Sequence, residues 1–484
     1  MENLSDSDLQ SSPEQPVVAL TPTSENLVDI WQATGSFPYP DLQVFPPPST
    51  HEYSKNELRL IHHLSSLSND LRRNGSSKLT VFTQQIPKFL SIASSYPFVM
   101  HALLSFSANH LAWTHRSNEA RTLHIHHGSI ALRGLHEAIG SFSRENADAV
   151  LAGSVLMLWQ ATDWRSWSSL RAGIQSILNT MRSWPHESNF AEYLVEGDII
   201  ANSYRTHRRR SSVPFSERSA ILQQAAQAVQ RAQMALAGQD CELHWISQLL
   251  TYIQRLQGMP PAQSAPDQFS QFYHLRKWLM WLPVALLQRT QSQGPAMLTL
   301  AQFYATALAL EPLFPDLGSS FCGAIALPPL EAIIGVTDSM QTEQVMSPAL
   351  LEIATVMQYP QQVALQYRTR AAQFQHMATA QDHHFTTMSP ETMGPASIGN
   401  MSPAFAPPAL HYSTSQSSSA AQSPFLEVPS SAQPGFSWGT QAWGAVPSPG
   451  LPAQNYQPQD EQQMYGYLPS SNFAGGFVSP SIWV

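Results

Sequence analysis

The chain has 484 residues, with 34 acidic and 25 basic side chains and a net charge of −9. This sign of charge opposes a general phosphate-neutralising surface, so composition argues against direct nucleic-acid binding. The two cysteines, Cys241 and Cys322, form no spacing pattern and exclude a disulfide framework. The first residues show no signal or transit pattern, and no apolar stretch reaches the ~18 residues of a membrane span.

Residues 1–52 are rich in Ser, Pro and acidic side chains, and they include three consecutive prolines, Pro46 to Pro48. Such a composition is typical of segments that do not fold, so we expect a flexible leader here. Leu27 to Trp31, with the sequence LVDIW, is the one stretch of this leader that we interpret as a possible short docking motif.

Helical patterns dominate from Tyr53 onward, and strand-type alternation is scarce. Ser54 and Glu57 have the spacing of a capping box, and a helical stripe follows them: Leu58, Ile61, Leu64, Leu67 and Leu71. Pro97 is suited to the first turn of the next helix, and Asn118 to the N-cap of a third. The sequence therefore predicts an all-α, multi-helix domain over residues 53–373.

Residues 146–181 place Trp159, Trp164 and Trp167 between two apolar patterns of helical spacing. This arrangement predicts a helical hairpin with an aromatic corner. Tryptophans at helix joints belong to the core far more often than to a ligand site. A second segment, residues 275–315, contains the string WLMWLP followed by a second helical pattern. Pro283 lacks an amide proton, so we expect a kink or a helix boundary there.

The second half of the domain begins after a break near residues 205–215, which contains Arg208, Arg209 and Arg210. We interpret this basic triplet as a solvated loop, with nuclear import or a kinase target as alternatives. Helices are predicted at about residues 216–236, 243–257, 269–287 and 296–310, with an irregular turn around Gly318 and Gly323.

The strings over residues 146–181 and 275–315 resemble the helical regulatory domain of fungal zinc-cluster transcription factors, which carry six cysteines and two zinc ions. The resemblance is strongest to the sterol-uptake-control-like branch, and it extends over roughly Tyr53 to Gln373. It implies a nuclear regulator of RNA polymerase II transcription that works with transcriptional coregulators.

That family carries a six-cysteine, zinc-binding DNA-reading module ahead of the regulatory domain. Cys241 and Cys322 cannot rebuild such a cluster, so we expect the module to be lost or missing from the gene model. The chain as given is then expected to act through a DNA-binding partner and to bind no DNA itself.

The resemblance also implies that a small lipid, such as a sterol, is held in a helical pocket. The candidate wall residues are Trp159, Trp164, Trp167, Met181, Trp278, Trp281, Phe303 and Tyr304. The same side chains would serve equally well as ordinary core, which is the interpretation we favour.

Residues 374–484 are dominated by Ser, Pro, Gln, Ala and Gly, and there is no lysine or arginine from Ala371 to the end. We expect this tail to be disordered. Its spaced aromatic residues are typical of segments that fold against a coactivator, and a plain linker is an equally weighted alternative.

Catalytic and metal signatures are weak in this sequence. No strand–elbow serine motif, phosphate loop or dinucleotide fingerprint occurs, so the sequence predicts no catalytic residues and no enzyme. His101, His110, His115, His124, His126 and His127 fall in neighbouring helices. His124 and His127 share a helical face, but a metal would need a third ligand, so we predict no metal site and no cofactor.

The sequence as a whole predicts a fungal transcription regulator with a helical regulatory domain, sensing a small lipid in one interpretation. The alternative is a helical protein-interaction scaffold or corepressor-like partner that binds neither DNA nor a ligand. A lipid-modifying helical enzyme is disfavoured because paired acids and nucleophiles are lacking.

Overall fold

The computed structural model describes residues 20–184, 188, 190, 213–289, 293–317, 319–343 and 355–373. Every regular element in these ranges is a helix, which confirms the all-α prediction. The predicted tail at 374–484, the basic triplet at 208–210 and residues 1–19 of the leader lie outside the described residues. None of the described helices combines the length and apolarity that crossing a membrane requires.

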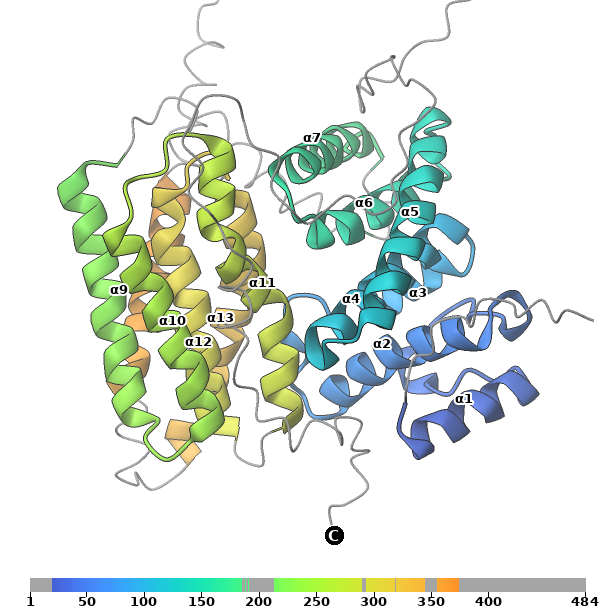
Figure 1. The fold of residues 1–484 in the computed structure, drawn as a ribbon, viewed down its shortest axis with the longest axis horizontal. Coiled ribbons are helices and arrows are strands. Elements are labelled where there is room, and N and C mark those ends of the chain that lie inside the picture. Colours follow the sequence, from blue (N-terminus) through green and yellow to red (C-terminus); the bar gives the residue numbers. More distant parts are fainter. Residues whose placement is uncertain are drawn as a thin grey trace, which may run out of the picture.

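The helices form two groups that lie side by side (Figure 1). The first group is drawn in blue to teal and contains α1 (Pro22–Thr34), α2 (Lys55–Arg73), α3 (Ile86–Ala93), α4 (Pro97–His115), α5 (Asn118–Gly140), α6 (Ala147–Gln160) and α7 (Trp164–Met181). The second is a bundle of α9 (Phe215–Ala235), α10 (Asp240–Gly258), α11 (Ala265–Arg289), α12 (Gln293–Leu310) and α13 (Ser319–Glu343). Residues 355–373 are also helical.

Local sequence signals begin several of these helices. Ser54 Oγ accepts from the Glu57 amide, and the Glu57 carboxylate accepts from the Ser54 amide, so the predicted capping box is confirmed. Pro97 opens α4, as predicted. The N-cap of α5 is Ser117, one residue before the predicted Asn118; its hydroxyl accepts from the Ala120 amide.

The prediction of a flexible leader is wrong for residues 20–52, the part of the leader that the structure describes. Thr21 caps α1, Pro22 occupies its first turn and Gly35 ends it in the left-handed conformation. Val28 and Trp31 are fully buried in the common core, and Lys55 of α2 pairs with Glu25 and Asp29. The folded unit therefore begins about thirty residues earlier than the predicted boundary at Tyr53, since α1 starts at Pro22. The LVDIW motif is part of its packing.

The prediction of a kink or boundary at Pro283 is also corrected, because α11 continues through this residue. A proline inside a helix removes one backbone hydrogen bond. Both neighbours of Pro283 in sequence, Leu282 and Val284, are fully buried, and α11 contacts helices of both groups. Packing on all sides of α11 offsets the loss of that bond.

The two groups share one hydrophobic core. Trp281 of α11 lies against Phe82 and Phe106 of the first group, with ring centroids 5.7 and 4.8 Å apart. Tyr304 of α12 is fully buried, and its hydroxyl donates to the Leu79 carbonyl across the same boundary at 2.9 Å. The helices α11 and α12 therefore join the bundle to the first group.

Candidate functional site

The corner between α6 and α7 is the aromatic corner that the sequence predicts. Asp163 caps α7 by accepting from the Ser166 amide at 2.9 Å, so the chain turns within residues 161–163. Trp167 is 1% exposed, whereas Trp164 is half-buried, and their ring centroids are 5.5 Å apart. Trp167 therefore packs in the core at this corner, and Trp164 lies partly exposed beside it.

Arg276 of α11 holds this corner against the bundle. Its Nη2 donates to the carbonyls of Leu158, Trp159 and Ala161, at 3.2, 3.1 and 2.6 Å. These carbonyls lie at the C-terminal end of α6, where backbone acceptors lack helical partners and the helix dipole favours a cation. Burial lowers the pKa of Arg276 to about 10, so the guanidinium stays charged at neutral pH.

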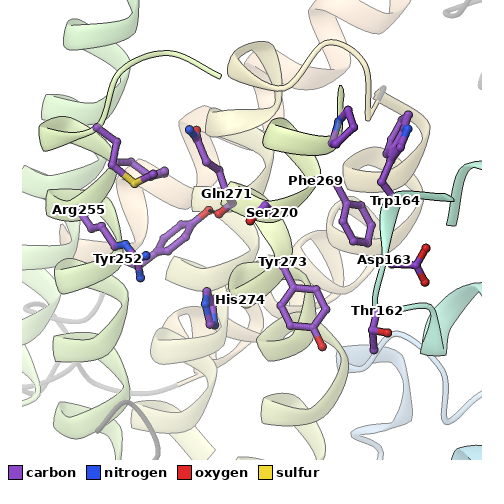
Figure 2. A pocket seen from close by; sticks show the side chains of 13 residues that line it. Thr162, Asp163, Trp164, Tyr252, Arg255, Phe269, Ser270, Gln271, Tyr273 and His274 are labelled. Atoms are coloured by element: carbon purple, nitrogen blue, oxygen red, sulfur yellow. Dashed lines mark hydrogen bonds between the residues drawn. The ribbon is translucent and has the colours of Figure 1, made fainter. Parts of the chain in front are cut away.

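A cavity of about 340 Å³ opens beside this corner, between α7, the end of α10 and the start of α11. Figure 2 shows Trp164 and Phe269 on one side of it and Tyr252 and Arg255 on the opposite side. Its other lining residues are Thr162, Asp163, Leu256, Met259, Pro266, Ser270, Gln271, Tyr273 and His274. The walls combine aromatic rings with several polar and charged side chains, so the cavity offers both apolar surface and hydrogen-bonding groups to a small molecule.

Contacts between the helices fix the walls of this cavity. The Tyr252 hydroxyl donates to the Gln271 carbonyl at 3.0 Å, which ties α10 to α11. Phe269 lies 5.7 Å from Trp167 and 5.2 Å from the Arg276 guanidinium, centroid to centre. Arg276 therefore contacts Phe269 in the cavity wall and also joins the two groups of helices.

The eight predicted wall residues are divided among several places. Trp164 lines the cavity, and Trp167 lies directly behind it. Trp278 and Phe303 meet edge to face at 5.7 Å inside the bundle. Trp159 and Trp281 both contact Phe82 and Phe106 at the boundary between the groups. Met181 and Tyr304 are fully buried.

Sequence reasoning missed the residues that form most of the cavity wall. Phe269 and Tyr273 have the i, i+4 spacing that places two rings on one face of a helix. The sequence contains that spacing, but the prediction placed only a helix there and assigned no role to the two rings. The contribution of α10, through Tyr252 and Arg255, has no local signature because it depends on which helices become neighbours.

These features describe a helical domain with an aromatic-lined cavity at the junction of two helix groups. The family model described as "Fungal specific transcription factor domain" matches residues 87–262, which include α4 to α10 and the aromatic corner. Over residues 87–262 the chain is therefore similar to fungal transcription factor domains, which confirms the resemblance inferred from the sequence. The matched model is described as a transcription factor domain, which points to a regulator.

Two relatives are similar over shorter segments. Sterol uptake control protein 2 of Candida albicans is 32% identical over 99 residues, which is 20% of this chain and 13% of the relative. Sterol uptake control protein 2 of Saccharomyces cerevisiae is 42% identical over 67 residues, 14% of this chain and 7% of the relative. The chain thus matches only a small part of either relative's length. No solved structure matches the chain.

Proposed function

We propose that this protein is a nuclear regulator of RNA polymerase II transcription in a fungus, whose helical domain binds a small apolar molecule such as a sterol. The observation that carries the proposal is the cavity between α7, α10 and α11, which lies at the end of a matched regulatory domain. Two proteins that are similar to short segments of the chain are named for the control of sterol uptake, which favours a sterol-like ligand. The regulator would act with coregulators and a DNA-binding partner.

The dimensions and chemistry of the cavity suit such a ligand. Its volume of about 340 Å³ falls at the lower end of the range of small-molecule sites. Trp164 and Phe269 offer apolar surface, and Arg255, Tyr273 and His274 supply polar groups for a single hydroxyl. A rigid apolar body with one polar end matches this distribution.

The test is ligand-induced stabilisation of the purified chain, with cholesterol as the probe sterol and a straight-chain fatty acid as the comparison. A ligand that binds only the folded state raises the melting temperature. Ser270→Trp introduces a large ring at the cavity wall and should abolish the rise caused by cholesterol. Ser129→Trp, at an exposed helical serine of α5, is the matched control and should retain it. Equal stabilisation of both variants would refute the assignment of the ligand to this cavity.

The alternative, a helical interaction scaffold that needs no ligand, is favoured by one feature of α5. Ile125 and Leu132 are seven residues apart on this helix and are 53% and 48% exposed. Exposed apolar side chains on one helical face are suited to a protein partner. A reporter assay with the domain fused to a separate DNA-binding module distinguishes the two. The scaffold requires Ser270→Trp to leave reporter output unchanged and Ile125→Lys to reduce it.

A further inference from the structure

Three side chains from three different helices meet within the first group of helices. They are Glu57 of α2, His101 of α4 and His127 of α5, and their potential ligand atoms all lie within 4.8 Å of one another. His101 Nδ1 and His127 Nδ1 are 3.0 Å apart. In a tetrahedral zinc site with Zn–N bonds of about 2.0–2.1 Å, two ligand nitrogens are ~3.3 Å apart. The two imidazoles therefore need to separate by only a few tenths of an ångström to share a metal ion.

The third ligand is already oriented by its neighbours. Glu57 Oε2 accepts from both the amide and the hydroxyl of Ser54, at 2.8 Å each. Hydrogen bonds of this kind hold metal-binding carboxylates in place. Glu57 thus brings a fixed negative charge to the two imidazoles, and it is half-buried, so that solvent reaches the group.

Packing holds the two imidazoles side by side. His127 is 3% exposed and His101 is half-buried, and their rings are stacked with centroids 5.3 Å apart. His126 beside them is exposed, and its ring centroid lies 5.1 Å from that of His127.

We propose that Glu57, His101 and His127 form a binding site for a divalent transition metal of the zinc class. Two imidazoles and one carboxylate form a donor set of this class, since Mg²⁺ and Ca²⁺ prefer sites made of oxygen atoms. Three protein ligands leave a fourth position for water. A bound ion would link α2, α4 and α5, and so would stabilise the first group of helices without involving the cavity beside α7.

This site was not predictable from the histidine spacing. His124 and His127 share a helical face, but His124 Nδ1 lies 2.9 Å from the Ser105 hydroxyl, and His127 meets His101 instead. The third ligand comes from the N-terminal capping box of α2, where a glutamate has an ordinary structural role.

The experiment measures Zn²⁺ binding to the purified, untagged full chain after treatment with a chelator. We expect one ion per chain by competition with a chromophoric chelator, and a rise in melting temperature on adding Zn²⁺. Co²⁺ in place of Zn²⁺ should give the visible absorption of a tetrahedral complex that includes imidazole ligands.

Two variants test the assignment. Glu57→Gln keeps the hydrogen-bonding pattern of a capping box but removes the anionic ligand, and His101→Gln removes one imidazole at a half-buried position. Each should weaken Zn²⁺ affinity tenfold or more while the helical circular dichroism is kept. His136→Gln, at an exposed histidine of α5, is the control and should bind as the original chain does. Absence of stoichiometric binding, or unchanged affinity in both site variants, would overturn the proposal and leave a simple imidazole–imidazole hydrogen bond.

Discussion

Trp164 and Trp167 lie one helical turn apart in α7 but occupy different environments. Trp167 is 1% exposed and lies between Phe269 and the Arg171 guanidinium. Trp164 is half-buried and lines the cavity. Their side chains are the same size, so replacing each in turn separates core packing from ligand binding.

We predict that Trp167→Ala lowers the free energy of unfolding by ~3–5 kcal/mol, because it leaves a large void in a packed core. Trp164→Ala should cost clearly less in the ligand-free protein and should remove stabilisation by cholesterol. Urea unfolding of both variants gives the comparison. Equal losses for the two variants would place Trp164 in the core as well.

A buried pair of histidines makes the stability of the domain depend on pH. His63 Nε2 and His110 Nδ1 are 2.9 Å apart, and both side chains are almost fully buried. Burial lowers the pKa of His110 to about 3, and burial together with the nearby His110, His115 and His62 lowers the pKa of His63. Both imidazoles are therefore neutral in the folded protein at pH 7.

We predict that the free energy of unfolding falls as the pH drops below about 6.5. In that range the unfolded chain takes up protons at these histidines and the folded chain does not. The loss approaches about 1.4 kcal/mol per pH unit for each histidine, until the pH nears the lowered folded-state pKa. Above pH 6.5 both states are neutral there, and this contribution to stability is fully present.

His110→Gln provides the check, since its amide can still hydrogen-bond to His63 but cannot be protonated in this range. Its urea-unfolding free energy should depend less steeply on pH between 6.5 and 4 than that of the original chain. Identical slopes would assign the acid sensitivity to other groups.

At the level of single residues, the sequence indicates which side chains are unusual but not which ones meet. The histidines and tryptophans stand out in the sequence, and the corner at Trp164 and Trp167 was predictable from helical spacing. The partners of His101 and His110 come from other helices, and only the packing of those helices determines them.

Among the elements, α1 is a short helix that an analysis of composition misses, because most of its residues are polar or exposed. Only Val28 and Trp31 of its thirteen residues are buried, so the segment as a whole is polar enough to suggest a flexible leader. The sequence nevertheless contains local signals for both ends of this helix: Thr21 and Pro22 at the start and Gly35 at the end. The longer helices were predictable because their apolar patterns repeat over several turns.

We predict that Trp31→Ala lowers the free energy of unfolding by ~3–5 kcal/mol, as expected for a large side chain removed from a core. Ile30→Ala, next to it and 49% exposed, should change it by less than about 0.5 kcal/mol. Thermal or urea unfolding distinguishes the two. A negligible effect of Trp31→Ala would mean that α1 is detached from the core in solution.

Helix α11 has the opposite character, because its apolar residues surround it. It contacts α2, α4 and α7 of the first group as well as α10 and α12 of the bundle. A helix packed on all sides tolerates Pro283, whereas a sequence rule that considers the helix alone predicts an interruption. The rule failed because the stabilising contacts are tertiary.

On the scale of the whole molecule, the shared core makes the two groups interdependent. Trp281 packs among the rings of the first group, and Tyr304 donates to the Leu79 carbonyl. The helical periodicity of the sequence does not show that the two groups pack against each other. Each group, considered alone, has the apolar pattern of a separate helical domain. The break near residues 205–215 suggested two halves but not their docking.

We predict that the described domain unfolds in one cooperative transition, with coincident curves from tryptophan fluorescence and circular dichroism. Tyr304→Phe should lower the free energy of unfolding by about 1–3 kcal/mol, because it leaves the Leu79 carbonyl without its donor. Tyr273→Phe, at a half-buried position of α11, serves as the comparison and should cost less. Two separated transitions in the original chain would show that the groups fold independently.

The cavity draws one wall from the corner of α6 and α7 and the other from α10 and α11. Chains are synthesised from the N-terminus, so a growing polypeptide has no such cavity until α11 has left the ribosome and docked. A molecule bound there can stabilise only the finished domain and cannot assist its earlier intermediates. The amount of mature protein in the cell would then rise with the ligand through slower degradation, with no change in the rate of its synthesis.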